Sequence, residues 1–110
     1  MNYLKYKEKE LPIKIDFGTI KNTSAKLNLK LSQFELVLDN LDYTSVLFFE
    51  SLKRGFKLEG KVFDISEAEA EEILAENYAD FLMIVSQEVL KVFTPKSKQQ
   101  TETTIEEKKR

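Results

Sequence analysis

The chain has 110 residues and a mass of 12.8 kDa, a length typical of one domain. It contains no Cys, His or Trp, which excludes a histidine base, a thiolate nucleophile, disulfide bonds and the usual zinc site of imidazole and thiolate ligands. The net charge is −2, far from the strongly basic balance of a nucleic-acid-binding domain. We therefore expect no nucleic-acid partner.

The apolar residues are divided into short runs. The N-terminal residues lack the apolar stretch of a secretory signal. The longest apolar runs, 46–49 and 81–85, are much shorter than the roughly 20 residues that span a bilayer. We expect no membrane partner and a cytoplasmic location.

The N-terminal segment has the pattern of strands. Residues 3–16 alternate apolar and polar side chains, and a period of two indicates strands. The polar residues 8–10 are predicted to form the turn of a hairpin. From Phe17 the apolar spacing lengthens to that of a helix, and residues 31–41 repeat the helical pattern. The sequence thus predicts a hairpin followed by helices.

A middle helix is predicted from its capping residues. Asp42 or Thr44 is expected to cap its start, and Gly55 and Gly60 bracket its end. The apolar face of this helix includes residues 46–49.

Two further helices complete the predicted body. Ser66 and Glu69 fit the capping box that opens a helix, and a last helix is expected from Tyr78 or Ala79 to Phe93. The fold class is therefore mainly α (α+β), with a short N-terminal β-hairpin followed by a small bundle of about four or five helices.

The domain is expected to end near residue 94. Beyond Phe93 the one large hydrophobic side chain is Ile105, so residues 95–110 cannot bury enough surface to offset the entropy of ordering them. We interpret 1–94 as a single domain that is net acidic, and 95–110 as a polar, flexible tail that is net basic.

Acidic residues offer two weak candidates for chemistry. Glu67, Glu69, Glu71, Glu72 and Glu76 cluster near the predicted start of a helix, where acidic side chains are favoured by the helix dipole rather than by catalysis. The stretch 39–50 lacks the oxygen ligand and the glycine that a calcium loop requires. We expect no catalytic residue, no metal and no cofactor.

Basic residues offer one further candidate. The stretch 53–57 places Lys, Arg and Lys around Phe56, and such a patch can contact a nucleic-acid backbone. A solvated helix end is the preferred interpretation, because the dipole favours cations there. The three glycines have no phosphate-binding spacing. The chain is predicted not to be an enzyme.

The apolar excess is more informative. The last predicted helix is apolar over more than one face, as is the stretch 46–49. Such helices are buried on several sides in a small core, or part of their surface contacts another subunit or a client. The candidate partner-binding residues on these two helices are Phe48, Phe49, Phe81, Met83 and Val85.

The order of these elements resembles that of a known family. The segment Leu11-Pro12-Ile13-Lys14-Ile15-Asp16-Phe17-Gly18-Thr19-Ile20-Lys21 resembles the opening of tail assembly chaperones of long-tailed phages and prophages. The following order is also similar, with a middle helix that has a basic end, a linker, the Ser66 start and a closing apolar helix. The resemblance covers residues 1–94.

This resemblance implies a non-enzymatic role in the host cytoplasm. Members of the family bind the tape measure protein, keep it soluble and assist assembly of the tail tube around it. The expected partner is therefore the tape measure protein or another apolar helical client, and we also expect self-association. The alternative is a small cytoplasmic adaptor or regulator of protein–protein interactions that is unrelated to tails.

Overall fold

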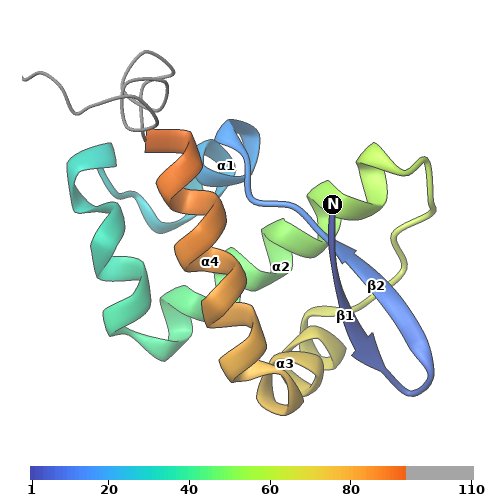
Figure 1. Cartoon of the computed structure of the whole chain (residues 1–110). Coiled ribbons are helices and arrows are strands. Elements are labelled where there is room, and N and C mark those ends of the chain that lie inside the picture. The colour runs from blue at the N-terminus through green and yellow to red at the C-terminus, as the bar shows by residue number, and fades with distance from the viewer. Residues whose placement is uncertain (94–110) are drawn as a thin grey trace, which may run out of the picture.

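A hairpin and a set of helices form the described part of the chain, residues 1–93 of a computed structural model (Figure 1). Within these residues lie two strands, four α-helices and one 3₁₀ helix: β1 (Asn2–Tyr6), β2 (Lys9–Ile13), α1 (Phe17–Leu27), η1 (Leu31–Asp39), α2 (Leu41–Leu58), α3 (Glu67–Glu76) and α4 (Tyr78–Phe93). This architecture confirms the predicted fold class. The predicted tail, 95–110, lies outside the described residues.

The two strands form an antiparallel hairpin with a tight turn. Lys7 and Glu8 occupy the turn with φ of 49° and 65°, the left-handed pair of a type I′ turn. The turn therefore lies at residues 7–8 rather than at the predicted 8–10, because the strand pairing continues to Tyr6 and Lys9. Its left-handed residues match the right-handed twist of the strands.

Hydrogen bonding alternates along this hairpin. The pair that flanks a two-residue turn is hydrogen-bonded, and every second pair along the ladder is not. Tyr3 is paired with Pro12 and falls at a position without ladder hydrogen bonds. Pro12 lacks an N–H group, so this position costs the ladder nothing.

Helix α1 begins at a capped turn beside α2. The Asp16 carboxylate accepts a hydrogen bond of 3.1 Å from the Thr19 N–H, and the Thr19 side chain completes a capping box. Phe17 is 64% exposed, although it follows the alternating apolar residues of the strands. The cause is that Phe17 is the first residue of α1 and no longer follows the strand period.

The segment after α1 is a 3₁₀ helix rather than an α-helix. Phe34 and Val37 are its buried residues, and their spacing of three matches the three residues per turn of a 3₁₀ helix. Leu31 and Leu38, which were expected on the same face, are exposed.

The start of α2 differs from the predicted cap. Asn40 caps the helix by accepting hydrogen bonds from the N–H groups of Asp42 and Tyr43. Thr44 is instead buried, and its hydroxyl donates to the Val37 carbonyl at 2.7 Å. A preceding Asn, like a Ser or an Asp, satisfies the free N–H groups of a first turn, so the cap lies two residues before Asp42 and four before Thr44, the two predicted caps.

The end of α2 is a Schellman motif. Gly60 has φ of 68°, its N–H donates to the Lys57 carbonyl, and the Lys61 N–H donates to the Phe56 carbonyl. These bonds satisfy two carbonyls of the last turn, and the positive φ favours glycine.

Helix α2 is the centre of the fold. It contacts β2, α1, η1 and α3, and Gly55 lies so close to β2 that an added Cβ would come within 2.3 Å of the Pro12 carbonyl oxygen. Gly55 therefore lies inside the helix and does not end it. The lack of a side chain there lets the hairpin pack directly on the helix backbone.

Helices α3 and α4 close the core from the other side. The Ser66 hydroxyl caps α3 by accepting from the Glu69 N–H at 3.1 Å, as the sequence predicted. Phe81 of α4 and Phe48 of α2 are both fully buried and pack edge to face, with ring centroids 4.9 Å apart. This aromatic pair links α2 and α4, and its edge-to-face geometry adds to the stabilisation from the burial of both rings.

A buried glutamate links α4 to the N-terminal segment by hydrogen bonds. Glu88 is 5% exposed, and its carboxylate accepts hydrogen bonds from the backbone N–H of Ile15 and the side-chain amide of Asn2. The Ile15 N–H would otherwise be a buried donor without an acceptor.

Candidate functional site

Three of the five predicted partner-binding residues lie in the core. Phe48 and Phe81 are fully buried and Val85 is 2% exposed, so the folded chain presents none of them at its surface. This corrects the prediction, and the physical reason is that these side chains fill the space between α2 and α4. Met83 is 62% exposed and is the predicted residue that the fold leaves most open.

Phe49 is only half-buried, but it has intramolecular partners. Its ring packs edge to face on Phe63, with centroids 5.4 Å apart. The ammonium groups of Lys26 and Lys53 lie 5.5 and 5.6 Å from its centroid, within the range of cation–π contacts. Phe49 therefore contributes to the packing of α1 and the linker to α3 against α2.

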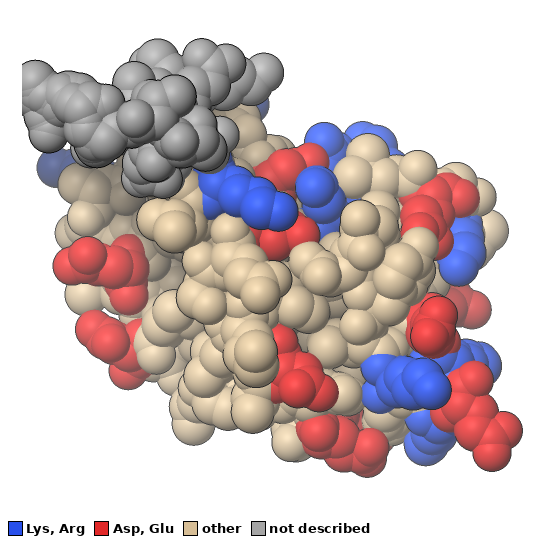
Figure 2. Space-filling model, viewed as in Figure 1, with Lys and Arg blue, Asp and Glu red and all other residues tan. Residues whose placement is uncertain are grey.

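The outer face of α4 is apolar and open. The buried residues Phe81, Ile84, Val85 and Glu88 face the core. We define the outer face of α4 by six exposed or half-exposed side chains: Tyr78, Ala79, Leu82, Met83, Ser86 and Val89. The exposed Asp80, Gln87 and Lys91 lie along the other flank of the helix. Figure 2 shows a mainly uncharged stretch over this helix. An amphipathic surface helix places charges on this side, so α4 departs from the usual pattern.

A shallow apolar pocket adjoins this face. The junction pocket has a volume of about 400 Å³ and is lined by Leu41, Ser45, Glu71, Leu74, Ala75 and Tyr78. It lies where the starts of α2 and α4 meet α3. Leu41 is 68% exposed, because as the first residue of α2 it extends beyond the core. Tyr78 belongs to both features, so the pocket and the outer face of α4 form one continuous surface.

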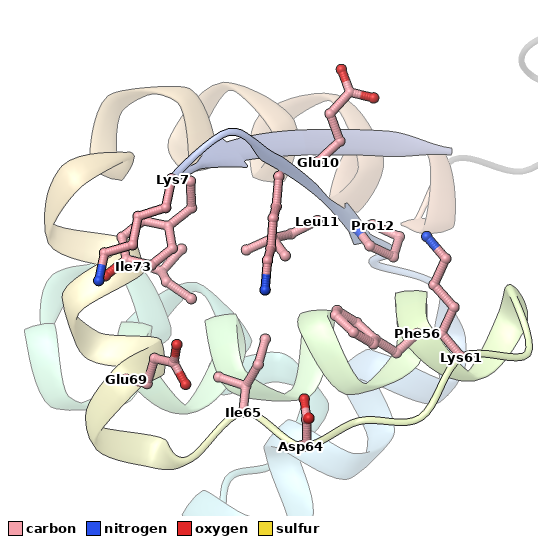
Figure 3. Close-up of a pocket in the computed structure, with 12 residues that line it drawn as sticks. Lys7, Glu10, Leu11, Pro12, Phe56, Lys61, Asp64, Ile65, Glu69 and Ile73 are labelled. Carbon is pink, nitrogen blue, oxygen red and sulfur yellow. The ribbon is translucent and has the colours of Figure 1, made fainter.

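A second pocket lies between the hairpin and the linker to α3 (Figure 3). This hairpin pocket has a volume of about 550 Å³. Leu11, Phe56, Ile65 and Ile73 contribute its apolar lining, while Glu10 points away from it in Figure 3. Both basic and acidic side chains lie at its rim. Its lining contains neither an imidazole nor a thiol.

The basic stretch 53–57 mainly forms ion pairs. The Arg54 guanidinium donates to both carboxylate oxygens of Asp16, at 3.1 and 2.8 Å. Lys53, together with Lys26 of α1, pairs with the buried carboxylate of Glu50. Arg54 and Lys26 thus link α1 to α2, whereas the pair of Lys53 with Glu50 lies within α2. A pocket of about 470 Å³ beside them includes Lys57.

The pKa of Asp16 reflects this pairing. Partial burial taken alone would raise the pKa of its carboxyl, but the hydrogen bonds from Arg54 and from the Thr19 N–H outweigh burial and hold the pKa below its ordinary value. Asp16 therefore stays ionised at neutral pH and acts in structure, as a helix cap and an ion-pair partner.

The acidic candidates occupy structural positions. Glu67 and Glu69 lie in the first turn of α3, where they are favoured by the helix dipole. The calcium-loop-like stretch contains the cap of α2 at Asn40, and its last residue, Glu50, is paired with two lysines. Among residues 1–93 no cluster of three or more potential ligands is placed to hold a metal ion.

Sequence reasoning missed Leu41 and Ala75 as surface residues. Leu41 follows the capping residue Asn40, and recognition of that cap would have placed it in a first turn that projects past the core. Ala75 carries no signal in the sequence, because it is placed in the junction pocket only by the packing of α3 on α2.

No helix within residues 1–93 combines the length and apolarity needed to cross a membrane. No family model matches the chain, and neither curated proteins nor solved structures match it.

Proposed function

We propose that this protein is a non-enzymatic chaperone that binds an apolar helical client through the junction pocket and the outer face of α4. Its specific role is that of a tail assembly chaperone for the tape measure protein, in line with the resemblance of residues 1–94 to that family. The observation that carries the proposal is the continuous apolar surface from Leu41 through Tyr78 to Met83.

The chemistry of this surface suits a helix. An amphipathic helix binds a groove by placing apolar side chains at i, i+3, i+4 and i+7 against it. The junction pocket offers a depression for one such side chain, and the outer face of α4 offers an apolar ridge beside it. The charged groups lie mostly away from this surface (Figure 2), where they keep the chain in solution before a client binds.

The test is coexpression with the tape measure protein from the same phage or prophage. The variant Leu41→Glu places a charge at the rim of the junction pocket. Glutamate is favoured in a first helical turn, so α2 itself should not be weakened. We expect this variant to weaken client binding about tenfold, a typical effect at a central interface residue, and to lower the soluble fraction of the tape measure protein.

The control is Val62→Glu. Val62 is 84% exposed and lies in the linker between α2 and α3, away from the proposed surface. The Val62→Glu substitution introduces the same charge at an exposed apolar residue and should leave client solubility unchanged. Equal client solubility with wild type, Leu41→Glu and Val62→Glu would contradict the proposal. Capture of a host regulatory protein that depends on Leu41, with no effect on the tape measure protein, would favour an adaptor unrelated to tails.

A further inference from the structure

The open edge of β1 is a second surface of this protein, which adjoins the proposed client surface at Met83. The sheet has two strands and therefore two edges. The β2 edge is covered, because Pro12 lies against the backbone of α2 at Gly55 and the Lys14 N–H donates to the Ser51 carbonyl at 3.2 Å. Among the described residues, no backbone hydrogen bond from outside the hairpin reaches β1.

The ladder leaves specific backbone groups of β1 unpaired. Tyr3 and Lys5 pair with Pro12 and Glu10 at the positions that carry no ladder hydrogen bonds. At such positions the N–H and C=O groups of each strand point away from the partner strand. Tyr3 and Lys5 therefore present their backbone groups at the open edge, where another strand can be bound.

A groove runs along this edge. The edge groove has a volume of about 420 Å³ and is lined by Asn2, Tyr3, Leu4 and Lys5 of β1 and by Asn77, Asp80, Met83, Ile84 and Gln87 of the α4 region. Residues of α4 form its far wall, so a segment bound along β1 would lie beside α4.

We propose that the edge groove binds an extended segment of a partner protein in which apolar residues alternate with polar and acidic ones. The segment adds to the sheet as a third strand, by β-augmentation. Backbone hydrogen bonds to Tyr3 and Lys5 hold it, and its side chains alternate between the two faces of the sheet.

The lining determines the chemistry of the segment. In the bound segment, the residue opposite Leu4 lies on the inner face, toward Met83 and Ile84. This segment residue is therefore expected to be apolar. The segment residue opposite Lys5 lies on the outer face, where Lys5 is exposed and favours an acidic cross-strand neighbour over a basic one. Asp80 on the α4 wall of the groove disfavours acidic residues elsewhere in the segment.

The experiment uses the full chain and the capped peptide Thr-Val-Glu-Val-Thr-Val-Thr, with affinity measured by calorimetry. Lys5→Pro removes the outward N–H and keeps the ladder, just as Pro12 does on the other strand. Lys5→Ala removes the charge but keeps that N–H. We expect Lys5→Pro to weaken peptide binding about tenfold, the effect of one lost hydrogen bond with its steric consequence, and Lys5→Ala to weaken it only about twofold.

Amide hydrogen exchange provides a readout that needs no variant. Peptide should slow exchange of the Tyr3 and Lys5 amides, while the Leu4 and Tyr6 amides, already bonded in the ladder, should change little. A peptide with lysine in place of its glutamate should bind more weakly. This measurement keeps the proposal falsifiable if Lys5→Pro does not fold.

Several results would overturn the proposal. These are equal binding by Lys5→Pro and Lys5→Ala, absence of binding at millimolar peptide, or protection confined to the junction pocket. Protection of the Tyr3 and Lys5 amides without peptide would also overturn it. The occupant would then be a second copy if that protection grew with protein concentration, and the chain itself if it did not. Leu41→Glu should leave peptide binding unchanged, so this test fails or succeeds independently of the proposed chaperone function.

Discussion

Helices α2 and α4 show opposite relations between apolarity and burial. The more apolar helix is α4, yet it buries four residues, whereas α2 buries eight. Helix α2 is enclosed by β2, α1, η1 and α3, while α4 mainly contacts α3 and β1. A helix rich in apolar residues therefore need not be central, and the excess of apolar side chains on α4 remains exposed or half-exposed.

The largest expected effect concerns the aromatic pair that joins the two helices. Phe48→Ala and Phe81→Ala should each lower the free energy of unfolding by about 3–5 kcal/mol, because each removes a fully buried ring and leaves a cavity. Chemical denaturation measures both losses.

Hydrogen exchange then tests the contrast between the helices. Phe81→Ala should speed exchange in α4 more than in α2, because fewer elements hold α4 in place. Equal acceleration in both helices would show that α4 is as integral to the core as α2.

The next effect tests the close approach of α2 to the hairpin. Gly55→Ala should lower the free energy of unfolding by about 1–3 kcal/mol, since the new Cβ would overlap the backbone of Pro12. Elsewhere in a helix the same change is stabilising, so the sign of the effect measured by thermal denaturation is decisive.

Gly60→Ala is the matched control. A Cβ at Gly60 meets no atom within 4 Å, but φ is positive there, so only backbone strain of about 1 kcal/mol is expected. A stabilising Gly55→Ala would show that the hairpin does not pack directly on α2.

On the α4 side, the buried carboxylate provides a comparable test. Glu88→Ala should cost about 1–3 kcal/mol of unfolding free energy, because the Ile15 N–H loses its acceptor. Glu88→Gln keeps an acceptor oxygen and should recover most of the loss in urea denaturation. If the two variants were equally unstable, the charge rather than the hydrogen bond would hold α4.

A smaller effect should appear as a pH dependence on the α2 side. The pKa of Asp16 is lowered in the folded chain, and the unfolded value is about 3.9. Its contribution is therefore fully present above the unfolded pKa and is lost as pH falls through the folded pKa. Asp16→Asn keeps a capping oxygen and removes this contribution, about 1 kcal/mol or less at neutral pH.

The measurement for Asp16 is the difference in unfolding free energy between wild type and Asp16→Asn across acidic pH. This difference should shrink toward lower pH as the wild-type carboxyl becomes protonated. A difference independent of pH would show that the ion pair with Arg54 does not stabilise the fold.

The smallest effect is expected on the outer face of α4. Met83→Gln should change the free energy of unfolding by less than about 0.5 kcal/mol, because Met83 is 62% exposed. A loss above 1 kcal/mol in thermal denaturation would mean that Met83 belongs to the core, and the contrast between α2 and α4 would then be wrong.

Local signals in the sequence were reliable where one or two residues decide the conformation. The Ser66 cap of α3 and the change of period at Phe17 both depend on neighbouring residues and their backbone groups. The cap of α2 was predicted two or four residues too late, at Asp42 or Thr44. Both are chemically as suitable as Asn40, and only the structure shows which side chain accepts from the free N–H groups.

The candidate site was less predictable than the fold. Phe48, Phe81 and Met83 look alike in a sequence as large apolar side chains, and two of them are core residues while the third is exposed. Helical periodicity groups residues on a face but does not say which face meets the rest of the chain.

By itself, the sequence determined which segments are strands and which are helical, their order and the chemical groups available, because these depend on residue identity and on the apolar period. The tertiary structure alone decided that α2 is enclosed, that Gly55 receives the hairpin, and that the apolar side of α4 and the edge of β1 remain open. Burial is a property of contacts between distant segments, so no local pattern specifies it.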